Sequence, residues 1–193
     1  MINRLVHFSD LHVRLFKDHD LYRGILESAL KEWKTLQPDR IVFTGDLVHS
    51  KNQMTPELVE FVAWILTECA KITKTIVIIG NHDFLENNNT RLDALTPIID
   101  SLKNDNIVYY KNRGVYEDEN VNWCVYSLMQ HNIPPDIPKQ IDGKINIGLF
   151  HGPIKGLKTD LGFEIEDGFD SNKFNGCDIV LCGDIHKRAI FEI

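Results

Sequence analysis

The sequence lacks any apolar run near the roughly 20 residues that a membrane-spanning helix needs. Its first residues, MINRLVHFSD, already have the pattern of a strand, so we expect neither a secretory signal nor a transit peptide. Internal repeats and low-complexity segments are also absent. These absences predict a cytoplasmic protein that makes no use of a membrane.

Cysteine is scarce, and no two cysteines form a C-x-x-C pair. All of them lie in apolar stretches, at Cys69, Cys124, Cys177 and Cys182. We expect these thiols to be buried and reduced, as is usual in a cytoplasmic protein. The pattern argues against a disulfide framework and against a thiolate zinc site.

Positive charge is also in short supply, with 21 Lys and Arg against 28 Asp and Glu and a net charge of −7. Proteins that bind nucleic acid usually have a basic surface. The balance therefore argues against tight, unaided binding of duplex DNA. Carboxylates that bind divalent cations would account for part of the excess.

The 193 residues are enough for one sizeable core, and the pattern alternates between strand and helix in the first half. Caps are predicted at Asp20 and at Thr55, the latter followed by proline. The predicted strands of this half span 4–8, 40–44 and 74–79, and a weaker helix spans 92–102. Later strands are predicted at 106–110, 114–118, 121–127, 144–150, 177–182 and 188–193. We expect an α/β (α+β) fold in one domain: a parallel βαβαβ unit and a mixed or antiparallel sheet, packed as a two-sheet sandwich flanked by helices.

Polar side chains follow five of these strands. They are Asp10 and His12, Asp46 and His49, Asn81 to Asp83, His151, and Asp184 and His186. Because the carboxyl ends of strands in an open α/β sheet line one edge, these five segments are expected to converge. Each motif alone is weak, since an Asp after a strand is usually a turn residue and a lone His is usually structural. The prediction depends on the presence of all these motifs together, in this order and each at the end of a strand.

The predicted cluster mixes carboxylate, imidazole and amide donors. Carboxylates brought together repel each other unless a cation binds them. A mixed N/O donor set suits Mn, Fe, Zn or Ni better than Ca. The candidate ligands are more numerous than one ion can use, and they fit two ions that share one carboxylate. They are Asp10, His12, Asp46, Asn81, His151, Asp184 and His186.

The order D-x-H, G-D, G-N-H-D, lone His and G-D-x-H, from Asp10 to His186, resembles the calcineurin-like metallophosphoesterases. The segments VHFSDLHV and GDLVHSKNQMTPELVEF look like those of SbcD-type nucleases of the Mre/Rad complexes and their phage relatives. The added signal is His49, three residues after Asp46. The Asp-Arg-Gly turn usual in protein Ser/Thr phosphatases is missing here.

The resemblance implies a role for each motif residue. One metal would bind Asp10, His12 and His186, the other would bind Asn81, His151 and Asp184, and Asp46 would bridge the two. His82 is similar to the family's catalytic histidine, and His49 to a histidine that helps place the DNA strand. Asp83 either orients His82 or serves as a plain cap; both readings stay open.

The sequence departs from the family pattern in two places. Asp184 stands where the family has His, which favours Mn²⁺ in the second site, with Mg²⁺, Fe and Zn as alternatives. The family's nucleases also continue with further strands, a DNA-capping region and a segment that docks an ATPase. We therefore expect a catalytic domain over residues 1–193 that is either truncated or completed by a partner.

The implied activity is two-metal hydrolysis of DNA phosphodiester bonds, as an exonuclease or endonuclease in repair or recombination. The implied partners are DNA, an SbcC-like (Rad-type) ATPase subunit and a second copy of the chain, in the cytoplasm of a bacterium or a phage-infected host. A phosphoesterase for nucleotides or small phosphate esters is the alternative, which the acidic charge favours. A non-catalytic scaffold is a third reading, which the retained motif residues argue against.

Overall fold

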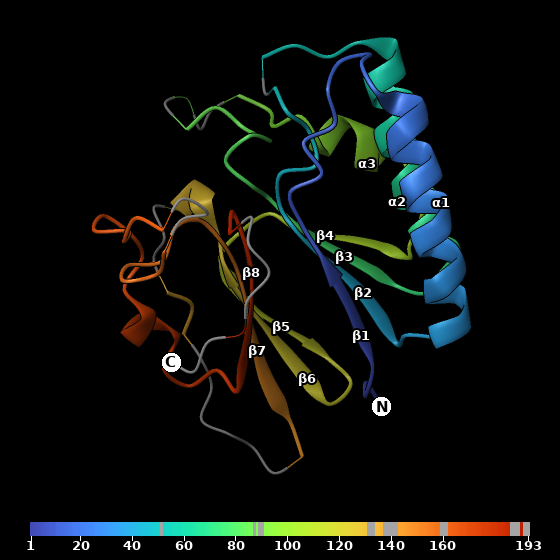
Figure 1. Ribbon diagram of the computed structural model, residues 1–193. Helices are drawn as coiled ribbons and strands as arrows, with labels where there is room; N and C mark the ends of the chain where they lie inside the picture. The colour runs from blue at the N-terminus through green and yellow to red at the C-terminus, as the bar shows by residue number, and fades with distance from the viewer. Residues whose placement is uncertain are drawn as a thin grey trace.

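Two four-stranded sheets lie face to face in this protein (Figure 1). The computed structural model describes residues 1–50, 52–86, 88, 91–130, 134–136, 143–158, 162–185 and 190. The first sheet is parallel throughout, in the order β1 (Leu5–Phe8), β2 (Arg40–Thr44), β3 (Thr75–Ile78) and β4 (Ile107–Tyr110). The second has the order β5 (Gly114–Asp118), β6 (Val121–Tyr126), β7 (Ile145–His151) and β8 (Ile179–Gly183). Within the described part of this sheet the β5–β6 pair is antiparallel and the other two pairs are parallel, so the predicted mixed sheet is confirmed.

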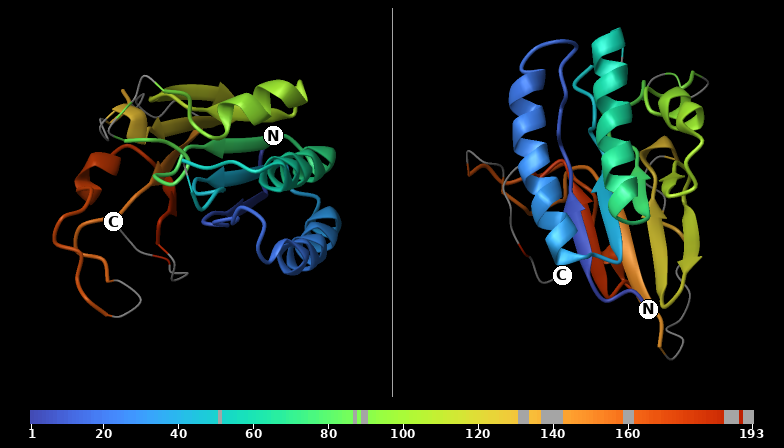
Figure 2. Two further views of the ribbon diagram at one scale, coloured as in Figure 1. Left: turned by 90° about the horizontal axis from the view of Figure 1, so that it is seen from above. Right: turned by 90° about the vertical axis from the view of Figure 1, so that its right-hand side faces the viewer.

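Helices cover the outer face of the first sheet (Figures 1 and 2). They are α1 (His19–Leu36), α2 (Pro56–Ile72) and α3 (Thr96–Leu102), with short 3₁₀ turns at Leu128–Gln130 and Ser171–Phe174 elsewhere. Thr55 caps α2 as predicted, since its side chain accepts the N–H of Leu58 at 3.3 Å. The predicted cap at Asp20 is wrong, because α1 already begins at His19.

Apolar side chains fill the space between the two sheets. Val42, Ile76 and Ile78 of the first sheet pack against Trp123 and Leu149 of the second. The opposite face of the first sheet packs against α1 and α2, with Phe43 and Phe61 fully buried there. The outer face of the second sheet is covered by the chain after β7. There, Phe169 and Phe174 pack on Tyr126 and Phe150.

The sequence assigned β4 to the wrong sheet. Residues 106–110 were expected to belong to the second, mixed sheet, whereas β4 extends the parallel sheet beside β3. It reaches that position through α3, which forms the third parallel crossover. The strand predicted at 188–193 lies outside the described residues, apart from Ile190.

The topology sends five strands toward one end of the sandwich. β1, β2 and β3 are parallel neighbours, and so are β6, β7 and β8. In Figure 1 the carboxyl ends of β1, β2, β3, β7 and β8 all point to the upper end of the molecule. Among the described residues, no helix has the length and apolar character to cross a membrane.

Candidate metal centre

The loops after β1 and β2 run side by side and hold three candidate ligands. Asp10 and His12 donate their backbone N–H groups to the carbonyls of Gly45 and Asp46, each at 3.0 Å. Asp10, His12 and Asp46 have left-handed backbone, with φ of 57°, 46° and 60°. Such a conformation costs a non-glycine residue ~1–3 kcal/mol. The hydrogen bonds between the loops hold all three side chains at one edge in spite of this cost.

Asp46 lies at the centre of the cluster and is only 1% exposed. Its Oδ1 accepts the backbone N–H of His82 at 2.8 Å. Its Oδ2 is 3.5 Å from His12 Nε2 and 3.3 Å from His151 Nε2. Burial acts to raise the pKa of Asp46, but the imidazole of His151 and other neighbours outweigh it and lower that pKa. Asp46 is therefore an ionised carboxylate between two imidazoles.

His151, at the end of β7, is fully buried and fixed by backbone. Its Nδ1 donates to the carbonyl of Thr44 at 2.7 Å, which turns Nε2 toward Asp46 and toward Asn81 Oδ1 at 3.2 Å. Burial acts to lower the pKa of His151, but the Asp46 carboxylate raises it to about 9. A metal ligand has to be a neutral imidazole, so an ion bound here would replace this proton.

Asp184 joins the same cluster from the end of β8. Its backbone N–H faces both carboxylate oxygens of Asp10, at 3.0 and 3.2 Å, and its φ of 70° is again left-handed. Two sets of three residues bring their ligand atoms within 4.8 Å of one another: Asp10, His12 and Asp46, and Asp46, His151 and Asp184. The two sets share Asp46, and its role as a carboxylate that bridges two ions stays a prediction. His186, the remaining predicted ligand, lies outside the described residues.

His82 is held beside this centre by the loop that contains His49. Its Nδ1 donates to the backbone carbonyl of His49 at 2.8 Å, which leaves Nε2 for other contacts. The ring of His82 packs 4.7 Å from the ring of His12 and 5.7 Å from that of His49. His12, His49 and His82 also form a third set with ligand atoms within 4.8 Å. The sequence could not reveal this contact with the carbonyl of His49, because it depends on how two loops meet.

The prediction that Asp83 orients His82 is wrong, because its carboxylate accepts backbone N–H groups instead. Its Oδ2 accepts the N–H groups of Asp46 and Gly80, each at 2.9 Å. Its Oδ1 accepts those of Leu47 and Val48, at 3.0 and 3.2 Å. Burial, together with the charge of Asp46, raises the pKa of Asp83 to about 7, although its N–H donors act in the opposite direction. Asp83 thus ties the turn after β2 to the turn after β3, which is closer to the predicted cap role.

Two glycines allow the strand ends to approach this closely. A Cβ on Gly80 would lie 2.2 Å from the backbone N and from Oδ1 of Asp46. A Cβ on Gly183 would lie 2.1 Å from the carbonyl oxygen of Thr44 and 2.5 Å from His151 Nδ1. Both contacts are with fixed groups, so any larger residue would push the strands apart at the cluster.

The donor set fits divalent cations. Asp46 Oδ2 is buried, and within the described part of the chain no group makes a hydrogen bond of ordinary geometry to it. A buried carboxylate oxygen in that state is costly unless a charge balances it. Carboxylate and imidazole donors without thiolate are typical of hydrolytic metal centres rather than structural zinc. The residues therefore form candidate sites for divalent metals, while the role of each residue as a ligand stays a prediction.

Comparisons with known proteins include a curated relative and a solved structure, among others. An uncharacterized protein, R555 of Acanthamoeba polyphaga mimivirus, is 33% identical over 199 residues. The match covers 96% of this chain, but this chain spans only 15% of that relative. The crystal structure of the nuclease MPE of Pseudomonas putida aligns with a TM-score of 0.40 and 16% identity, over 84% of this chain and 68% of that one.

A family model gives the wider match. The model of the calcineurin-like phosphoesterases matches residues 3–188, a span that includes every strand and candidate ligand described above. The matched span also includes the motif order on which the resemblance was based. This chain is a member of the calcineurin-like phosphoesterase family, with candidate His and Asp sites for divalent metals at the shared end of its two sheets.

Proposed function

We propose that this chain is a two-metal phosphodiesterase that hydrolyses DNA, in the manner of SbcD-type nucleases. The observation that carries the proposal is the pair of ligand sets that share the buried Asp46, with His82 fixed next to them. Asp10 and His12 would hold one ion with His186, and Asn81, His151 and Asp184 would hold the other. Mn²⁺ is the preferred ion because carboxylates outnumber imidazoles in the second set.

The residues of the chain have separate tasks in this reaction. These residues would hold divalent cations that would supply activated water and polarisation of the phosphoryl oxygens, so no Ser or Cys nucleophile would be needed. His82 lies outside the two sets that share Asp46, and its Nε2 is left available by the bond from Nδ1 to His49. From this position His82 would protonate the leaving oxygen or stabilise charge in the transition state.

DNA is the preferred substrate because of His49. This imidazole is exposed, lies 5.7 Å from the ring of His82, and sits at the open side of the centre. It can contact a strand whose phosphate reaches His82. The second candidate function, hydrolysis of nucleotides or small phosphate esters, is favoured by the net charge of −7.

The same charge leads us to propose a partner. An SbcC-like ATPase subunit would supply the basic surface that duplex DNA needs, or a second copy of the chain would add a further set of DNA contacts. The isolated monomer should therefore bind duplex DNA weakly at physiological salt. Binding in the nanomolar range by the monomer alone, measured by fluorescence anisotropy, would remove the need for such a partner.

The function is tested by offering four substrates with Mn²⁺: single-stranded DNA, linear duplex DNA, a chromogenic phosphodiester and a chromogenic phosphomonoester. A DNA phosphodiesterase cleaves DNA and the diester far better than the monoester. Preference for the monoester or for free nucleotides would establish the second candidate instead. Absence of hydrolysis in all four, with metal bound, would overturn both.

A further inference from the structure

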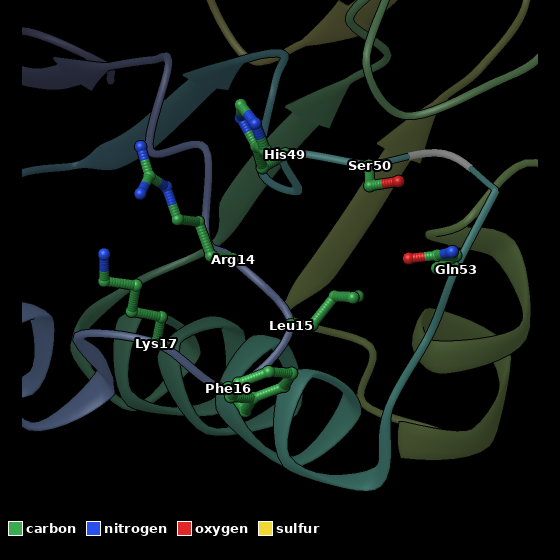
Figure 3. Close-up of a pocket in the computed structure, with 7 residues that line it drawn as sticks. All are labelled: Arg14, Leu15, Phe16, Lys17, His49, Ser50 and Gln53. Atoms are coloured by element: carbon green, nitrogen blue, oxygen red, sulfur yellow. The ribbon is translucent and has the colours of Figure 1, made fainter.

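An open pocket of about 410 Å³ lies beside the metal centre, between the loop after β1 and the segment that precedes α2 (Figure 3). His49 forms part of its wall and also packs against the rings of His12 and His82, at 5.8 and 5.7 Å. His49 therefore joins this pocket to the histidine cluster beside the candidate metal centre.

The lining of the pocket combines cations with an aromatic ring. Arg14 and Lys17 contribute two positive charges, and among the described residues of the lining there is no carboxylate. In the described part of the chain neither cation forms an ion pair. Phe16 lies between them in the chain and is 72% exposed. Figure 3 shows Arg14 and His49 projecting to the same side, with Ser50 and Gln53 on the segment that continues from His49.

The backbone of this loop is held without burying Phe16. His19 Nε2 donates to the carbonyl of Arg14 at 2.6 Å, and the hydroxyl of Thr55 donates to the carbonyl of Leu15. The β-bridge between Val13 and Val48 anchors the start of the loop. These bonds order the backbone of the loop, and the ring of Phe16 stays exposed beside the pocket.

We infer that this pocket binds the unpaired nucleotide next to the cleaved phosphodiester, with its base stacked on Phe16. Every base offers a π-face, so an exposed ring between two cations suits single-stranded polynucleotide of any sequence. Arg14 and Lys17 contact the flanking phosphates. The inference rests on the proposed function and adds a substrate subsite to it.

Phe16 is tested with two oligonucleotides of equal length, one normal and one abasic at the position next to the cleaved bond. Phe16→Ala should raise KM for the normal oligonucleotide about tenfold, as expected for the loss of one base stack. The same change should leave the abasic oligonucleotide with its wild-type KM. Phe16→Trp should restore KM, whereas Phe16→Leu, which keeps apolar area without an aromatic face, should not.

Arg14 and Lys17 are tested by salt dependence. The slope of log KM against log salt for single-stranded DNA should fall by about 0.7 for each of Arg14→Gln and Lys17→Gln. Ile25→Ala, which removes a 61% exposed apolar side chain from α1 outside the pocket lining, is the matched control and should change neither KM nor the slope.

The outcomes separate this inference from the function on which it rests. If the wild-type protein with Mn²⁺ hydrolyses neither oligonucleotide nor a chromogenic phosphodiester, the proposed function fails. If it hydrolyses them, but Phe16→Ala does not change the ratio of the two oligonucleotide KM values, the stacking subsite is wrong and the function stands. An unchanged salt slope in both Gln variants would likewise overturn the assignment of phosphate contacts.

Discussion

The two ends of the sandwich differ in how their charged side chains are arranged. At the end away from the candidate centre, Arg40 of β2 forms two bonds of 2.7 Å with Asp118 of β5 and one of 3.0 Å with Glu119. Glu119 also pairs with the N-terminal amine of Met1. Opposite charges meet here, and they join the two sheets.

At the candidate metal end, the carboxylates of Asp10, Asp46 and Asp184 face imidazoles and one another on left-handed backbone. The arrangement is a poor way to stabilise a fold, because like charges repel and the backbone is strained. The ion pairs at one end join the sheets, whereas the other end holds the candidate sites for cations. The predictions below test this contrast.

The largest effect should come from His82→Ala. Hydrolysis should fall by ~10²–10⁴, the usual cost of losing a proton donor or a charge stabiliser. Metal content, measured by mass spectrometry of the purified protein, should stay unchanged, because His82 lies outside the two sets that share Asp46. Loss of metal together with activity would instead make His82 a ligand of the third set.

At the opposite end, Asp118→Asn should lower the free energy of unfolding by about 3 kcal/mol, because it leaves Arg40 without its buried partner. Glu117→Gln, which breaks an exposed pair with Lys144, is the control and should leave the free energy of unfolding almost unchanged. Denaturant unfolding measures both.

The same pair also has a pH signature. The hydrogen bonds from Arg40 lower the pKa of Asp118 below its ordinary 3.8 in the folded state. The stability that ionised Asp118 contributes is therefore complete above pH 3.8, and it is lost as the pH falls through the lowered pKa of the folded state. Asp118→Asn should remove this part of the acid sensitivity. Equal acid unfolding profiles for the variant and the wild type would contradict it.

Manganese should stabilise the folded protein only by binding at the candidate metal end. Mn²⁺ at a hundred times its Kd should add about 2.7 kcal/mol to the stability of the wild type, visible as a rise in Tm that a chelator reverses. Asp46→Asn should lose most of this rise, because both ligand sets contain Asp46. Asp118→Asn should keep the full rise despite its lower starting Tm. A rise that survives in Asp46→Asn would place the ions elsewhere.

The smallest expected effect is a change of metal preference at Asp184. Asp184→His exchanges a hard oxygen ligand for imidazole, which suits zinc. The ratio of zinc-supported to manganese-supported activity should rise several-fold, whereas Asp184→Asn should weaken binding of the second ion. Equal manganese-dependent activity of Asp184→Ala and the wild type would show that Asp184 is not a ligand.

Much of the fold could be predicted because its signals are local. The strand at 40–44 and the Thr55-Pro56 start of α2 match the structure residue for residue. The predictions were wrong where the same local sequence pattern is compatible with more than one structure. Asp18 and Asp20 both flank the start of α1, and the structure begins the helix between them, at His19. The four residues of β4 fit either sheet by pattern, and their pairing with β3 was decided by the crossover through α3.

The sequence by itself determined which donors the protein has and the order in which strands deliver them to one end of the fold. Only the tertiary structure decided that Asp46 sits between the imidazoles of His12 and His151, and that Asp83 braces two turns. It also showed that Phe16 faces a pocket beside His49. The physical reason is range: periodicity and caps act within a few residues, whereas these contacts join loops that are 30 or more residues apart and are held by backbone hydrogen bonds.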